Sequence, residues 1–213
     1  FPDGRLAPQT QEPSLFDAAR TRALFDVWTA DARFALAQLI ALEAGAPQGR
    51  FTGRLDLERI AMLGHSFGGA NAAAACQQEP RLKACANMDG SFQGEYARGM
   101  EAPFLLMTAG HSLDETQQTF VQKMRGYHTG LEGAGHGTFT DLPLLLELMK
   151  GYAGGLDEGT FDTGRLGTRG VDILRAYVRA FLEEQLGARP SPLLEGPSRD
   201  FPEVRLTRHP GGG

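Results

Sequence analysis

Ser66 is the residue whose surroundings point most directly to chemistry. It stands in Gly64-His65-Ser66-Phe67-Gly68, which fits G-x-S-x-G, the pattern of a nucleophile elbow that joins a strand to a helix. A strained backbone in such a turn points the serine hydroxyl outward, and the flanking glycines let strand and helix pass closely. An apolar run ends at Leu63, and a Gly/Ala-rich stretch begins at Gly68. We therefore predict a nucleophilic serine rather than an ordinary glycine turn.

A serine nucleophile needs N–H donors for the negative charge that develops on the attacked oxygen. The N–H of Phe67, at the start of the predicted helix, is one candidate. A second donor usually comes from a loop after an earlier strand. Only 65 residues precede Ser66, and they contain one predicted long helix and one strand. We therefore expect the first strands and the second donor to lie in an N-terminal segment of the same protein that is not part of this chain.

The serine also needs a base, and five histidines are available: His65, His111, His128, His136 and His209. His136 lies in the glycine-rich stretch 133–137, after the last predicted strand, where this kind of site carries its histidine. The order of serine before histidine also fits. We therefore predict His136 as the base, with a surface loop histidine as the alternative.

Two aspartates compete to orient that base. Asp89 follows Ser66 by 23 residues and Asp114 follows it by 48, and each stands just after a predicted strand. The carboxyl ends of parallel strands are where such sheets meet ligands. Asp114 has a second explanation, because it is also suited to cap the helix that follows it. Spacing alone leaves the choice open.

The elements that must position these residues alternate between strand and helix, which predicts an α/β fold with a mostly parallel sheet flanked by helices. We predict one incomplete domain over residues 1–213, with a flexible tail at 205–213. The expected strands are 57–63, 84–88, 103–108 and 127–132, and the expected helices are 16–44, 68–76, 114–125, 142–149 and 171–186.

Composition excludes other classes of function. The net charge of −5 argues against a nucleic-acid partner. No apolar run is long enough for a transmembrane helix, which leaves contact with a membrane surface open. Cys76 and Cys85 have no metal-site spacing. We expect two buried thiols, with a single bridge across the 77–84 connection as the alternative. No metal site is expected, since no clustered His, Cys and Asp spacing is present.

Three segments resemble one protein family, the platelet-activating factor acetylhydrolases of the plasma lipoprotein-associated type and their bacterial relatives. The segment 60–70, with its core Gly-His-Ser-Phe-Gly-Gly-Ala, carries the resemblance. Some polyester hydrolases and lipases share that core. The segment 86–90 resembles the family's strand that ends in its catalytic aspartate, and the segment 135–141 resembles its histidine loop. The resemblance continues into the closing helix, 173–186.

The resemblance implies an α/β-hydrolase that cleaves short or oxidised sn-2 acyl esters of phospholipids, without calcium or a cofactor. It implies Asp89 rather than Asp114 as the acid, and it favours a secreted or periplasmic protein. The family usually has a bulkier residue where this chain has Gly90, so we expect a different pocket wall. The alternatives are a broader esterase, lipase or polyester hydrolase and a non-catalytic binding protein of the same fold. The candidates to line the pocket are His65, Phe92, His111 and Phe139.

Overall fold

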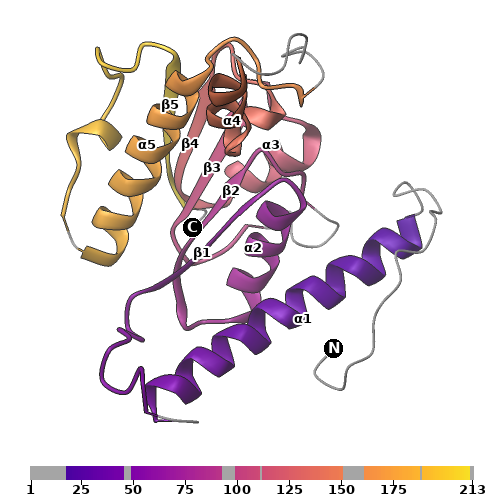
Figure 1. The fold of residues 1–213 in the computed structure, drawn as a ribbon, viewed down its shortest axis with the longest axis vertical. Helices are drawn as coiled ribbons and strands as arrows, with labels where there is room; N and C mark the ends of the chain where they lie inside the picture. Colours follow the sequence, from indigo (N-terminus) through magenta and orange to yellow (C-terminus); the bar gives the residue numbers. More distant parts are fainter. Residues whose placement is uncertain are drawn as a thin grey trace.

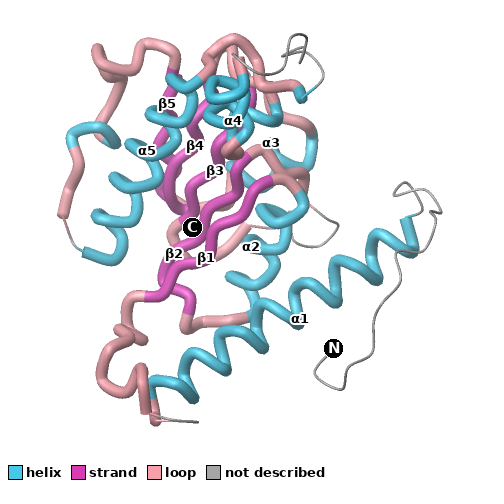
Figure 2. The backbone as a smooth tube through the Cα atoms, viewed as in Figure 1, coloured by secondary structure: helices cyan, strands magenta, loops and turns pink. Residues whose placement is uncertain are grey.

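A five-stranded sheet forms the centre of the protein. The structure is a computed structural model that describes residues 18–45, 49–92, 99–110, 112–150, 161–187 and 189–211. The strand order is β1-β2-β3-β4-β5. Strands β1 to β4 pair in parallel, and β5 joins β4 antiparallel. The predicted α/β class is confirmed (Figure 2). The strands are β1 (Ile60–His65), β2 (Leu82–Met88), β3 (Phe104–Ala109), β4 (Arg125–Leu131) and β5 (Val204–Pro210).

Helices cover both faces of this sheet (Figure 1). On one face lie α2 (Phe67–Gln78) and α3 (Glu115–Val121), and on the other lies α5 (Thr168–Gly187). The long helix α1 (Ala18–Glu43) packs against α2. After β4 come a short 3-10 turn, η2 (His136–Phe139), and the helix α4 (Leu142–Met149). A second 3-10 turn, η4 (Pro192–Leu194), follows α5.

Side-chain alternation along the strands divides the core into two layers. Phe104 and Leu106 of β3 pack with α2 and α3, whereas Leu105 and Met107 pack with α5. All four side chains are fully buried. β3 therefore has apolar residues on both faces, as expected for an inner strand of a parallel sheet.

The end of the chain corrects one prediction. Residues 204–210, expected to belong largely to a flexible tail, form β5 along the edge of β4. Only Val204 of this strand is buried, and most of its remaining side chains are exposed or partly exposed. The apolar signal of a buried strand is therefore missing, and the order comes from the backbone ladder to β4.

The cysteines take the alternative of the two predictions, because Cys76 and Cys85 form the single bridge and are not two buried thiols. Cys76 lies near the end of α2 and Cys85 lies within β2, and their Cα atoms are 6.4 Å apart. The short connection between α2 and β2 places these two elements side by side. The bridge therefore joins the helix after Ser66 to the strand before Asp89.

The strand that leads to Ser66 lies at an edge of the described sheet, because β1 pairs only with β2 there. Near it, α1 exposes several large apolar side chains, including Trp28 and Phe34. Within the described ranges, no helix combines the length and the apolar character that crossing a membrane requires.

Candidate active site

Ser66 occupies a strained turn between β1 and α2. Its φ of 58° and ψ of −126° lie outside the regions that residues with a side chain usually adopt. Its carbonyl oxygen accepts the N–H groups of Gly69 and Ala70, and its own N–H donates to the carbonyl oxygen of Met88. The Ser66 hydroxyl does not cap α2. The predicted elbow is thus present, with the hydroxyl not used for helix capping.

Two glycines allow the close approach of strand and helix at this turn. They are Gly64 and Gly69, whereas the motif pairs Gly64 with Gly68. A Cβ atom on Gly64 would collide with the backbone of Gly68, and one on Gly69 would collide with the side chain of Asn87. A Cβ on Gly68 would meet open space. The steric need assigned to Gly68 therefore belongs to Gly69.

Phe67 is the first residue of α2, so its N–H has no acceptor within the helix. Its carbonyl oxygen accepts a hydrogen bond from the buried side chain of Asn71. The Phe67 ring meets Phe25 and Trp28 of α1 edge to face, with ring centroids 5.7 and 5.0 Å apart. These contacts hold the predicted oxyanion donor from both its backbone and its side chain.

Asp89 follows the carboxyl end of β2, next to Ser66, which follows the carboxyl end of β1. Its N–H donates to the carbonyl oxygen of Met107, and its Oδ1 accepts the N–H of Ala109 at 2.8 Å. Its φ of 56° is again unusual for a residue with a side chain. The buried Asn87 side chain holds this turn with two hydrogen bonds, one from the N–H and one to the carbonyl oxygen of Gly90. The role of Asn87 is a contribution that sequence reasoning missed.

His136 meets Asp89. The Nδ1 atom of His136 lies 2.7 Å from Oδ2 of Asp89. A carboxylate only accepts, so Nδ1 carries the proton and Nε2 is left as an acceptor. Asp114 instead caps α3, where its Oδ1 accepts the N–H of Gln117 at 2.7 Å. The structure therefore brings Asp89, not Asp114, to the predicted base.

The backbone of His136 is held by two other side chains. Its N–H donates to Oδ2 of Asp162 at 3.0 Å, and its carbonyl oxygen lies 3.0 Å from Nε2 of His65. No sequence signal marked Asp162, because it stands far along the chain, beyond α4. Among the described residues no hydrogen bond joins the Ser66 hydroxyl to the His136 ring. The hydrogen bond between a nucleophile and its base is often long without substrate and tightens only when substrate binds. The contact between the two segments is made instead by His65, the residue before Ser66.

The other pocket predictions fare differently. Phe92 is buried in the core beside α3, where its ring stacks on that of Phe120 with ring centroids 4.0 Å apart. Phe139 is also buried, and its ring stacks beside that of His65 at 6.4 Å. His111 lies outside the described residues. His65 itself is half-buried, and its main contact is with the backbone of His136.

Burial holds the pKa of His65 below its ordinary value, and repulsion by the neighbouring His136 lowers it further. The two rings lie 4.5 Å apart. A neutral His65 with its proton on Nε2 donates to the His136 carbonyl oxygen. The lowered pKa of His65 therefore favours its neutral form next to the predicted base.

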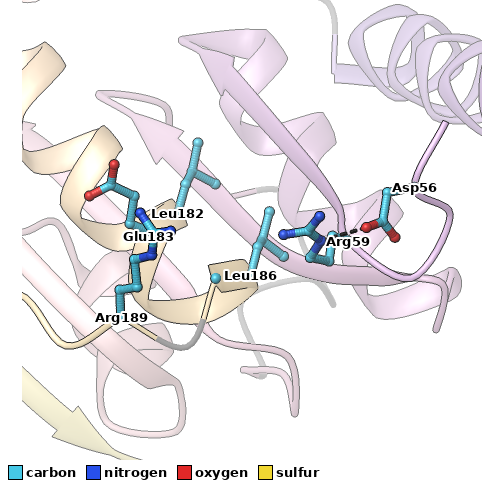
Figure 3. Close-up of a pocket in the computed structure, with 7 residues that line it drawn as sticks. Asp56, Arg59, Leu182, Glu183, Leu186 and Arg189 are labelled. Carbon is cyan, nitrogen blue, oxygen red and sulfur yellow. Dashed lines mark hydrogen bonds and ion pairs between the residues drawn. The ribbon is translucent and has the colours of Figure 1, made fainter. Parts of the chain in front are cut away.

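Two hollows of the described surface lie away from this site. One, of about 440 Å³, opens between the C-terminal end of α5 and the residues before β1, with Asp56, Arg59 and Leu186 among its lining side chains (Figure 3). A larger one, of about 1170 Å³, borders the starts of β2 and β4. Both are at the amino ends of the parallel strands, opposite Ser66. Among the described residues, no cluster of His, Cys, Asp and Glu is arranged to bind a metal ion.

A serine on a strand–turn–helix elbow, an aspartate after a neighbouring strand and a later loop histidine are the arrangement of the α/β-hydrolase class. Within that class, the chain belongs to the family described as "Platelet-activating factor acetylhydrolase, isoform II", whose model matches residues 40–189. The match includes Ser66, Asp89, His136 and Asp162.

Two proteins similar to this chain are named as esterases. The chain is 29% identical over 169 residues to a probable 1-alkyl-2-acetylglycerophosphocholine esterase of Arthroderma benhamiae, covering 68% of this chain and 42% of the relative. It also resembles the structure of a ferulic acid esterase from Streptomyces cinnamoneus, with a TM-score of 0.70 and 31% identity over 87% of this chain and 55% of that one. The chain therefore spans about half the length of these relatives.

Proposed function

We propose that the protein is a serine hydrolase of carboxylic esters that works through Ser66, His136 and Asp89. The observation that carries this proposal is the 2.7 Å contact between Nδ1 of His136 and Asp89, on a loop that also contacts the residue before Ser66. That contact leaves Nε2 of His136 free to accept the serine proton.

The steps of the reaction follow from these positions. Ser66 Oγ attacks the ester carbonyl carbon while Nε2 of His136 takes its proton. The N–H of Phe67 stabilises the negative charge on the carbonyl oxygen, and Asp89 stabilises the imidazolium. The tetrahedral intermediate then expels the alcohol, which takes the proton back from His136. A water molecule releases the acyl group by the same route and restores Ser66.

The substrate class that we favour is a short-chain acyl ester of a phospholipid, such as an sn-2 acetyl or oxidised acyl group. The family and the name of the fungal relative support it. The surface next to the histidine loop supports it as well. α4 begins three residues after Phe139 and exposes Leu145 by 50% and Leu148 by 75%. Exposed leucines at this place suit contact with a lipid surface.

A broader esterase is the second candidate, and the similarity to the ferulic acid esterase favours it. The discriminating measurement is kcat/KM on a short-acyl phospholipid, a nitrophenyl butyrate and a polyester film. Our proposal expects the phospholipid to be the best substrate. A clear preference for the nitrophenyl ester or the film would transfer the assignment to the broader class.

A non-catalytic binding protein of the same fold is the alternative from another class. A fluorophosphonate probe tests it, because such a probe reacts only with an activated serine. We expect labelling of Ser66 in the parent protein and none in Ser66→Ala. Failure of the intact protein to label would support the binding protein.

We also propose that the second oxyanion donor, and strands to pair with β1, come from residues outside this chain. Support comes from the edge position of β1, from the apolar side chains exposed on α1, and from the relatives, of whose length the chain covers only about half. Loss of one such donor typically lowers kcat by about 10²–10³. A chain of residues 1–213 as active as a version extended at its N-terminus would contradict the proposal.

A further inference from the structure

His136 is held at three of its atoms by three different side chains. Its ring Nδ1 meets Asp89, its backbone N–H donates to Asp162, and its backbone carbonyl oxygen meets His65. Only the first of these contacts belongs to the serine, histidine and aspartate set. The other two come from separate segments, one after α4 and one at the end of β1.

Asp162 belongs to a strap, residues 161–165, that crosses the histidine loop. The strap makes further hydrogen bonds to the loop besides that of the Asp162 carboxylate. The Asp162 carbonyl oxygen accepts the N–H of Gly137 at 2.8 Å. The Thr138 hydroxyl donates to the carbonyl oxygen of Thr163 at 2.8 Å. A Cβ on Gly135 would collide with Asp162. The strap and the loop therefore fit closely against each other.

The backbone of Asp162 supports a specific role. Its φ of 45° is costly for most residues, and Asp and Asn are among those that tolerate it best. A strained residue whose carboxylate meets the backbone of the predicted base points to a functional constraint. In this backbone conformation the Asp162 carboxylate accepts the N–H of His136.

His65 contacts the backbone of His136 at its carbonyl oxygen, whereas Asp162 contacts its N–H. His65 precedes Ser66, so its backbone position is set by the nucleophile turn, and its ring reaches across to the carbonyl oxygen of His136. Since a carbonyl oxygen only accepts, Nε2 of His65 must carry a proton. The buried Phe139 ring lies beside the His65 ring, with ring centroids 6.4 Å apart.

We propose that Asp162 and His65 are positioning residues that fix the backbone of His136 from both sides, so that its ring reaches Asp89 and faces the serine. This inference rests on the proposed function. A misplacement of about 1 Å in a reacting group can cost about a hundredfold in rate. We therefore expect loss of either contact to lower kcat by roughly ten- to a hundredfold while KM changes little.

Matched pairs of variants separate the contact from general packing. Asp162→Gly keeps a backbone that accepts positive φ but removes the acceptor, whereas Asp162→Asn keeps both. His65→Leu removes the donor, whereas His65→Gln retains an N–H at a similar distance. We expect the Gly and Leu variants to lose kcat on nitrophenyl butyrate and the Asn and Gln variants to recover most of it.

A second readout does not depend on turnover. The proton shared between Nδ1 of His136 and Asp89 should give a low-field resonance in the proton NMR spectrum. We expect Asp162→Gly and His65→Leu to shift or broaden it, and the conservative variants to preserve it. Asp89→Asn, which changes the acceptor itself, identifies the resonance.

Two outcomes would overturn the inference. One is an unchanged kcat and low-field resonance in Asp162→Gly and His65→Leu. The other is a change confined to KM in His65→Leu, which would make His65 a substrate contact. If the parent protein shows neither hydrolysis nor fluorophosphonate labelling, the proposed function fails. The resonance still tests the positioning role in that case, so the two failures are distinguishable.

Discussion

The backbone N–H of Ser66 donates to the carbonyl oxygen of Met88 at 2.9 Å, so the nucleophile turn is bonded to the residue that precedes Asp89. The next rung repeats the pattern, because the N–H of Asp89 donates to the carbonyl oxygen of Met107. Ser66 and Asp89 thus lie at the carboxyl ends of neighbouring strands that are joined by backbone hydrogen bonds. The histidine does not, and it depends on side chains to reach these two residues.

Replacing the acid tests the choice between the two aspartates. We expect Asp89→Asn to lower kcat by about 10⁴, because an amide favours the wrong imidazole tautomer. Asp114→Asn should leave turnover and stability nearly unchanged, since asparagine caps helices about as well. Asp114→Ala should cost about 1 kcal/mol of unfolding free energy through loss of the cap. Steady-state kinetics and urea denaturation measure both effects, and a larger kinetic loss in Asp114→Asn would reverse the assignment.

Replacing the serine sets the reference for all other variants. Ser66→Ala should lower kcat by at least about 10³, and a residual rate would reflect binding and oxyanion contacts alone. The measurement is hydrolysis of a nitrophenyl ester, with near-ultraviolet circular dichroism to show that the fold is kept. Retained turnover in this variant would mean that another residue attacks the ester.

The glycines of the elbow should respond unequally to an added methyl group. Gly69→Ala should destabilise the protein, because the new Cβ would collide with Asn87, which holds the Asp89 turn. Gly68→Ala should be neutral or stabilising by roughly 0.5–1 kcal/mol, since it adds helix propensity in open space. Thermal melting of the two variants provides the comparison. Equal destabilisation would show that Gly68 is also closely packed.

Stability should fall as the pH drops below about 6.5, the ordinary pKa of histidine. Burial lowers the pKa of His65 and of His209 in the folded protein. Between the folded and unfolded pKa values the unfolded chain binds more protons, so stability rises with pH across that window and is lost as pH falls through it. Each histidine contributes at most about 1.4 kcal/mol per pH unit.

His209→Gln is the matched variant for this effect, because His209 lies on β5, away from Ser66. Unfolding free energies from urea titrations between pH 5 and pH 7.5 should show a smaller slope in the variant. An identical slope would assign the loss of stability at low pH to other groups.

Ser66 and His136 could be predicted as nucleophile and base from the sequence, because a short motif and a glycine-rich loop mark them locally. The sequence could not choose between Asp89 and Asp114 by spacing, since that choice depends on which loop the histidine meets in space. The structure resolves the choice, because His136 meets Asp89 while Asp114 caps α3. The contact of Asp162 could not be predicted for the same reason, because it reaches a residue 26 positions away in the chain.

Local patterns also failed where stability comes from pairing rather than burial. β5 is largely exposed, so it lacks the apolar alternation that predicts a strand. The Cys76–Cys85 bridge depends on how tightly the chain turns between α2 and β2, which composition does not reveal. The requirement for glycine at position 69 rather than 68 likewise depends on a neighbour from another strand.

The Cys76–Cys85 bridge has a consequence for anyone who produces the protein. A reducing host cytosol would leave both thiols unpaired, whereas export to an oxidising compartment would allow them to join. A closed loop of this size is worth on the order of 3 kcal/mol. Preparations from the two kinds of compartment should therefore differ in melting temperature. Dithiothreitol should lower the melting temperature of the oxidised preparation to that of the reduced one. The choice of expression strain thus becomes an experimental variable in its own right.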